Sequence, residues 1–95
     1  MTNEIIHQLE LVKQFSIGQT IYVTERSTYE VETVNLDKID ISIYSNTYAH
    51  VCFIFVDRLG NVVDCMKLED FNRRFFTDVT AAYKAVDATK QEENK

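Results

Sequence analysis

Apolar residues recur along this chain with two different periods, and each period predicts its own kind of element. Near the start, Ile5, Leu9 and Val12 are spaced four and three apart. This spacing is typical of one apolar face of a helix over about residues 3–15. Gly18 follows at a position that suits the end of such a helix.

Three segments after this helix alternate between apolar and polar residues, which predicts strands with one buried and one wet face. The segments are "QTIYVTE", "TYEVETV" and "IDISIYS", and the polar breaks "RS" and "NLDK" between them resemble turns. The buried side is expected to carry Ile21 and Val23 in the first segment and Ile39, Ile41 and Ile43 in the third. In "TYEVETV" either face could be the buried one.

The stretch "VCFIFVDRLGNVVDCM" is the most apolar of the chain and predicts a hairpin. Its first half is apolar on both faces, as in a central strand or a barrel strand. Asp57 and Gly60 suit a three-residue loop. In a regular hairpin around that loop, Phe53 faces Cys65, so Cys52 lies on the other face of the sheet. We therefore expect both thiols to be free, as is usual in the cytoplasm.

Two helices are predicted after the sheet. "KLEDFNRRFF" places Leu68, Phe71 and Phe75 at helical spacing, and Thr77 resembles the N-cap of a second helix that continues through Val86. The predicted fold class is therefore α+β, with an N-terminal helix and two C-terminal helices. Its five-stranded, mostly antiparallel sheet is strongly twisted, and an SH3-like small barrel is an alternative to an open sheet.

The length and charge of the chain limit its organisation and its partners. With 95 residues we expect one domain over residues 1–90, followed by a frayed polar tail at residues 91–95. No long apolar run and no basic leader precede the domain, so we expect a cytoplasmic protein that does not enter a membrane. Fifteen acidic residues against ten basic ones give a net charge of -5, which disfavours non-specific binding to nucleic acid.

No catalytic motif is visible, and we expect a non-enzymatic protein without a cofactor. His50 and Cys52 share one strand face, but the paired ligand spacings of a metal site are missing. There is also no glycine-rich phosphate loop and no nucleophile elbow. An enzyme that uses His50 with Cys52 is one alternative. A small barrel that binds nucleic acid through Arg58, Arg73 and Arg74 is another, although three arginines make a sparse basic surface.

The wet face of the sheet is the predicted partner-binding surface. Tyrosine is enriched at protein interfaces, and carboxylates spaced along a sheet can imitate the phosphate backbone of DNA. Glu30 and Glu32 join this face only if Val31 is buried. An ordinary exposed strand face and a homodimer interface are the alternatives. The predicted contacts are Tyr22, Glu30, Glu32, Asp40 and Tyr44.

The combination of "IGQTIYV", "GNV" and "FFTDVTAAYKAV" resembles small phage-encoded accessory proteins, in which a curled sheet precedes an alanine-rich helix. The resemblance implies a protein that binds a host factor, such as a nuclease or a transcription component, and inhibits or redirects it. It carries no catalytic residues over to this chain, and a likeness at the level of fold is only an association. It spans residues 17–86 and rests on Gly18, Tyr22, Gly60, Phe76, Thr77 and Ala82.

Overall fold

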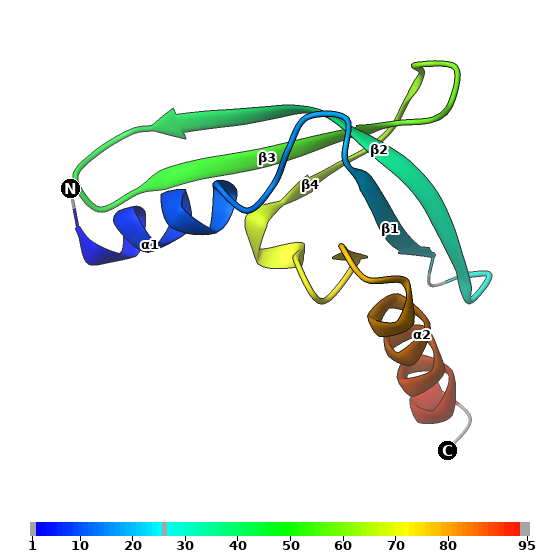
Figure 1. Cartoon of the computed structure of the whole chain (residues 1–95). Coiled ribbons are helices and arrows are strands. Elements are labelled where there is room, and N and C mark those ends of the chain that lie inside the picture. Colours follow the sequence, from blue (N-terminus) through cyan, green and yellow to red (C-terminus); the bar gives the residue numbers. More distant parts are fainter. Residues whose placement is uncertain (1, 26, 94–95) are drawn as a thin grey trace.

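The structure is a computed structural model that describes residues 2–25 and 27–93. Five strands form one antiparallel sheet in the order β4-β3-β2-β1-β5, accompanied by two α-helices (Figure 1). Because β4 and β5 are separate edges, the sheet is open: the α+β class is confirmed, and the SH3-like barrel is wrong. The elements are α1 (Asn3–Val12), β1 (Thr20–Glu25), β2 (Glu30–Ile43), β3 (Ala49–Val56), β4 (Val62–Lys67), the 3-10 turn η1 (Leu68–Asp70), β5 (Phe75–Phe76) and α2 (Val79–Glu93).

The hydrophobic core lies on the inner face of the sheet, the face that α1 covers. Ile5 of α1 is buried, and Leu11 and Val12 pack against the core. The N-terminal helix is thus confirmed, and the hydroxyl of Thr2 accepts a hydrogen bond from the Ile5 amide at its start. At the other end of the sheet, α2 lies against β1 and β5 (Figure 1) and buries Ala82. Neither helix is long and apolar enough to cross a membrane.

β2 is one strand of 14 residues where the sequence predicted two. The segment "NLDK" contains no glycine or proline, and the chain runs through it without turning. A β-bulge between Leu36 and Lys38 instead inserts Asp37 as an extra residue. Val34 faces inward before the bulge and Ile39 faces inward after it, because the extra residue changes the alternation.

The predicted helix over "KLEDFNRRFF" is wrong. One 3-10 turn ends at Asp70, whose carboxylate accepts a hydrogen bond from the Lys67 amide at 3.2 Å. Asn72 then takes a left-handed backbone angle, φ 64°, which interrupts any helix. Phe75 pairs with Val23 as part of β5, the fifth strand of the sheet. Phe71 and Phe75 lie at the two ends of a loop, and both pack in or against the core. This arrangement gives them their helix-like spacing without a helix.

The N-cap of α2 lies one residue later than predicted. The carboxylate of Asp78 accepts hydrogen bonds from the amides of Thr80 and Ala81, at 3.4 and 3.2 Å. Asp78, rather than Thr77, is therefore the N-cap of the helix. The helix continues to Glu93 and so includes the first residues of the predicted tail.

Cys52 and Cys65 form a disulfide, so the expectation of two free thiols is wrong. The cause is a second bulge, at Val63 in β4. This extra residue shifts the register, so that Ile54 rather than Phe53 faces Cys65. The shift turns Cys65 to the outer face, where Cys52 lies, and brings the two Cα atoms to 6.5 Å.

The β3–β4 turn is confirmed, and the carboxylate of Asp57 holds it. Its Oδ1 accepts hydrogen bonds from the amides of Leu59 at 2.9 Å and Asn61 at 3.0 Å. Gly60 supplies the left-handed angle, φ 84°, that the loop requires. The hydrogen bond from the Asn61 amide, and to a smaller extent the one from the Leu59 amide, holds the pKa of Asp57 below its ordinary value of 3.8.

Replacing Asp57 with alanine is expected to lower the melting temperature at neutral pH and to lose this effect in acid. A carboxyl group with a lowered pKa adds stability above its ordinary pKa, and this stability disappears as the pH falls through the lowered value. Thermal melts of the wild type and Asp57→Ala should therefore differ most above about pH 5 and converge below it. Asp87→Ala, at an exposed position of α2, is the control. A difference that does not change with pH would contradict this role.

Candidate protein-binding surface

The inner face of the β1–β2 hairpin carries carboxylates beyond the end of the core. In the strand register, Val23 faces Glu32, and Glu25 faces Glu30. Residues that face each other across an antiparallel pair share one side of the sheet, so these four side chains lie together. Val34 continues the same face toward the core. The hairpin thus changes from apolar to acidic along its length.

A cleft of about 310 Å³ opens on this face, between the β1–β2 hairpin and β4. The side chains of Val23 and Val34 are buried at its base, and Val63 is 44% exposed at its side. Carboxylates form its rim, so the cleft joins an apolar base to an acidic edge. This acidic cleft is lined by Val23, Glu25, Glu32, Val34, Val63 and Asp64.

The charges of the acidic cleft are not neutralised within the part of the chain that the structure describes. The one ion pair found there joins Lys38 and Asp40, at 3.3 Å, on the other face of the sheet. Glu25 accepts a hydrogen bond from the hydroxyl of Ser27 at 3.0 Å. Asp64 accepts one from the amide of Cys65 at 2.8 Å. These neighbours orient the two carboxylates without neutralising their charges.

The chemistry of the acidic cleft matches a lysine or arginine side chain. Such a side chain has an aliphatic stem, which can lie on the valines, and a cationic head, which can reach the carboxylates. Exposed charges attract over about 8–10 Å near physiological salt, so such a contact weakens as salt is added. The cleft is therefore suited to a basic residue on the surface of a partner.

The five predicted contacts do not form one surface. Val31 is half-buried beside Thr24, on the face that α2 covers, so Glu30 and Glu32 turn to the inner face. Glu32 lies in the acidic cleft, and Glu30 lies next to it along β2. Tyr22 belongs to the opposite face. The grouping of the two glutamates with the tyrosines is therefore wrong, and their role in binding stays a prediction.

The remaining predicted contacts are spread along the outer face. Tyr22 is half-buried and pairs with Phe76 of β5. Asp40 lies beyond the bulge of β2, in its ion pair with Lys38. Tyr44 is 69% exposed at the tip of the β2–β3 hairpin, where its ring stacks on Tyr48 with centroids 5.5 Å apart. These side chains belong to three separate places.

Two carboxylates of the acidic cleft were missed in the sequence. Glu25 follows Val23 by two residues, and this alternation alone would have placed both on one face. Asp64 reaches the inner face because the bulge at Val63 shifts β4. No turn residue marks that bulge, so the sequence holds no signal for it.

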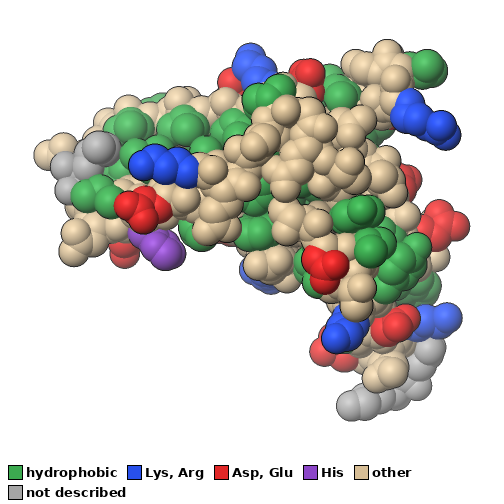
Figure 2. Space-filling view, viewed as in Figure 1, with side chains coloured by type: hydrophobic (Ala, Val, Ile, Leu, Met, Phe, Trp, Pro, Cys, Tyr) green, Lys and Arg blue, Asp and Glu red, His purple; other side chains and the backbone are tan. Residues whose placement is uncertain are grey.

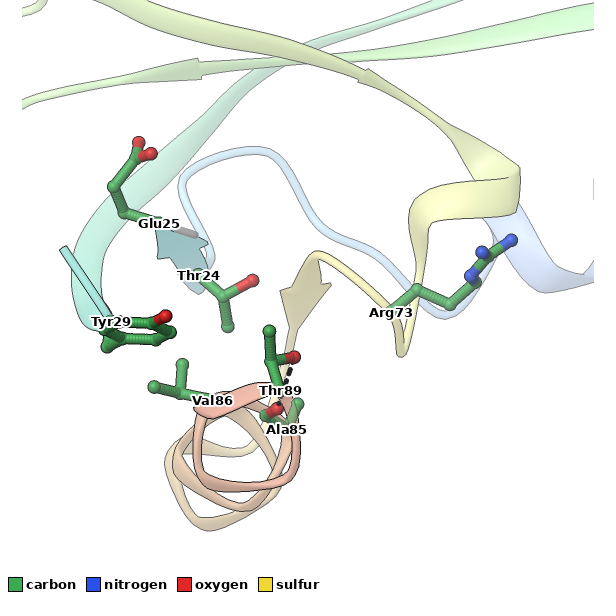
Figure 3. Close-up of a pocket in the computed structure, with 7 residues that line it drawn as sticks. All are labelled: Thr24, Glu25, Tyr29, Arg73, Ala85, Val86 and Thr89. Carbon is green, nitrogen blue, oxygen red and sulfur yellow. Dashed lines mark hydrogen bonds between the residues drawn. The ribbon is translucent and has the colours of Figure 1, made fainter. Parts of the chain in front are cut away.

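A second, smaller hollow lies between α2 and the β1–β2 hairpin (Figure 3). Its volume of about 30 Å³ has room for about two water molecules. Thr89 donates its hydroxyl hydrogen bond to the Ala85 carbonyl at 3.1 Å, and Arg73 points away from the hollow. Tyr29 closes one side with a left-handed backbone angle, φ 55°. The hollow is a packing gap under α2, and it brings no reactive groups together.

Histidine and cysteine do not assemble into a reactive site in the described part of the chain. Residues 2–25 and 27–93 contain no group of three His, Cys, Asp or Glu side chains that could hold a metal ion. His50 lies half-buried on the outer face near Cys52, but the sulfur of Cys52 is bonded to Cys65. A disulfide sulfur is neither a thiolate nucleophile nor a metal ligand. The alternative of an enzyme that uses His50 with Cys52 thus lacks its thiol.

The arginines of the nucleic-acid alternative lie in separate loops. Arg58 occupies the β3–β4 turn, whereas Arg73 and Arg74 are exposed in the loop between η1 and β5. Arg58 thus lies in a different loop from Arg73 and Arg74.

The resemblance to phage-encoded accessory proteins stays a prediction. No protein-family model, curated protein or solved structure matches the chain.

Proposed function

We propose that this protein is a small, non-enzymatic binding protein that docks on a basic surface of another protein and inhibits or redirects it. The observation that supports this function best is the acidic cleft, whose apolar base and carboxylate rim suit a lysine or arginine side chain. The resemblance described above adds a phage origin and a host target, such as a nuclease or a transcription component.

Imitation of DNA is the mode of inhibition that fits this surface. Proteins that bind nucleic acid carry lysine and arginine in the grooves that receive the phosphates. Glu25, Glu30 and Glu32 follow one another on the inner face of the hairpin, with Asp64 beside them. A row of carboxylates can occupy such a groove and exclude the nucleic acid from it. Complementary charge also speeds the encounter of the two proteins.

Removing the charge of the acidic cleft is expected to weaken partner binding by between about 3-fold and 160-fold, since three rim charges of about 0.2–1 kcal/mol each are lost. The test is a tagged pull-down from host lysate at low and at moderate salt, with the variant Glu25→Gln, Glu32→Gln, Asp64→Asn. A matched control, Glu4→Gln, Glu10→Gln, Glu69→Gln, removes the same number of exposed charges elsewhere. The wild type and the control should capture a partner at low salt, and the cleft variant should not.

Equal capture by the cleft variant and the control would contradict the proposed surface. A partner that survives moderate salt with undiminished affinity would contradict imitation of DNA, because charge contacts at a wet rim are screened. Recovery of nucleic acid instead of a protein would favour the alternative that uses Arg73 and Arg74. A gel-shift assay at low salt tests that alternative directly, and we expect no shift.

A cytoplasmic location is part of the same proposal, and the disulfide between Cys52 and Cys65 bears on it. Disulfides are rare in reducing compartments. Alkylation of the protein in cells before lysis, followed by mass determination with and without reductant, measures which form exists there. A fully oxidised protein would argue against a permanently reducing environment.

A further inference from the structure

The second half of β2 has a free edge. β1 begins at Thr20, which faces Asn35 of β2. The chain before β1 forms its last backbone hydrogen bonds to β2 at Leu36. From Lys38 to Ile43, β2 pairs only with β3. β2 is thus an internal strand in its first half and an edge strand in its second. Unpaired edges of this kind are templates for pairing with another strand.

The backbone groups on this edge belong to three isoleucines. Across the hairpin, the Tyr44 amide donates to the Tyr48 carbonyl at 3.0 Å. Successive residues of a strand direct their N–H and C=O groups to opposite sides, so alternate residues before Tyr44 also point to β3. The N–H and C=O groups of Ile39, Ile41 and Ile43 therefore point to the free edge. In the described part of the chain they have no backbone partner there.

Two of these isoleucines also expose their side chains. All three lie on the inner face, opposite residues of β3, but Ile41 is 42% exposed and Ile43 is 51% exposed. Hydrophobic side chains are visible along the β2–β3 hairpin in Figure 2. An edge that combines unpaired amides with exposed isoleucines is suited to pair with a further strand, which would also bury apolar surface.

We propose that a second copy of this chain pairs with this edge, antiparallel, with Ile41 facing Ile41 of the second copy. In this register Ile39 faces Ile43 of the second copy. Each residue whose N–H and C=O groups point to the free edge thus meets another such residue. Asp40 faces Ser42 of the second copy. The paired segment, residues 39–43 of each copy, lies within the free length of the edge.

Electrostatics disfavours the neighbouring register that is centred on Asp40. A shift that centres the pair on Asp40 also joins isoleucine to isoleucine, but it places two aspartates directly opposite each other. Like charges at such positions are destabilising. Centring on Ile41 avoids this contact and keeps the ion pair between Lys38 and Asp40. The twofold arrangement is self-complementary, as a dimer of identical chains requires.

This dimer and the acidic cleft use different parts of β2. The edge lies beyond the bulge at Asp37, whereas Glu30 and Glu32 lie before it. Backbone hydrogen bonds and apolar contacts hold the dimer, so we expect little dependence on salt. Binding at the cleft depends steeply on salt, and the two sites can therefore fail or succeed separately.

Sedimentation equilibrium of the full chain, at several protein concentrations and two salt concentrations, tests the proposal. The wild type is expected to show the mass of two chains. Ile41→Lys sets two lysines face to face at the centre, which should weaken dimerisation by more than about a hundredfold. Because Ile41 is part of a long strand, circular dichroism and a thermal melt verify that the variant is folded.

A matched pair at one position tests the register. Ser42→Asp places an aspartate opposite Asp40 of the second copy, twice per dimer, and should weaken dimerisation by about tenfold. Ser42→Lys places a lysine there and should keep or strengthen it. A monomeric wild type, a dimer that survives Ile41→Lys, or equal effects of the two Ser42 variants would overturn the proposal. A partner strand from another protein in place of the second copy would overturn it as well.

Discussion

Replacing Phe75 with alanine is expected to lower the free energy of unfolding by about 3–5 kcal/mol. The Phe75 side chain is fully buried, and its ring lies 5.2 Å from those of Phe53 and Phe55, centroid to centroid. Phe71 and Phe15 surround it at 5.5 and 6.1 Å. Removing the ring leaves a cavity that these neighbours cannot fill without losing their own contacts.

The position of Phe75 in the chain adds to the loss. β5 contains only two residues, and it joins α2 to the sheet. The free energy of unfolding of a domain of this size is roughly 5–15 kcal/mol, so the variant loses a large part of its stability. Urea denaturation should show an earlier midpoint with an unchanged slope. Leu59→Ala, at a position that is 87% exposed, is the control and should change stability by less than about 0.5 kcal/mol. A Phe75→Ala midpoint close to that control would contradict the packing described here.

Removing the disulfide is expected to cost about 3 kcal/mol of stability through the freedom that the unfolded chain gains. The bond joins Cys52 and Cys65, which are 13 residues apart. Reduction of the wild type and the double variant Cys52→Ala, Cys65→Ala should lower the midpoint of unfolding by similar amounts. The double variant should not respond to reductant. If the wild type unfolds at the same denaturant concentration with and without reductant, the disulfide does not stabilise the fold.

The elements that the sequence predicted correctly depend on local pattern. The helical spacing around Leu9 predicted α1, alternation predicted β1, and Asp57 with Gly60 predicted the β3–β4 turn. Each of these signals acts over a few residues. The helix over "KLEDFNRRFF" failed because its phenylalanines contact a sheet formed elsewhere in the chain. Tertiary packing overrides a local period in such a segment.

The register of the strands could not be predicted, and the candidate site depends on it. Two bulges, at Asp37 and Val63, each add one residue and exchange the faces of everything that follows. The first bulge places Asp40 on the face opposite to that of Val34. The second bulge places Cys65 on the same face as Cys52. Glu32 was predicted as a contact and lies in the acidic cleft, but its grouping with Tyr22 assumed that Val31 faces inward.

The pairing of β1 with β5 sets the order in which the protein can fold during its synthesis. The Thr24 hydroxyl donates to the carbonyl of Arg74, 50 residues further along, and Val23 pairs with Phe75. Before Phe75 has been synthesised, β1 has only β2 beside it and the core lacks the Phe75 ring. Contacts so distant in sequence form late, because the long intervening loop must close first. β1 therefore gains its second neighbour in the sheet only after Phe75 has left the exit tunnel.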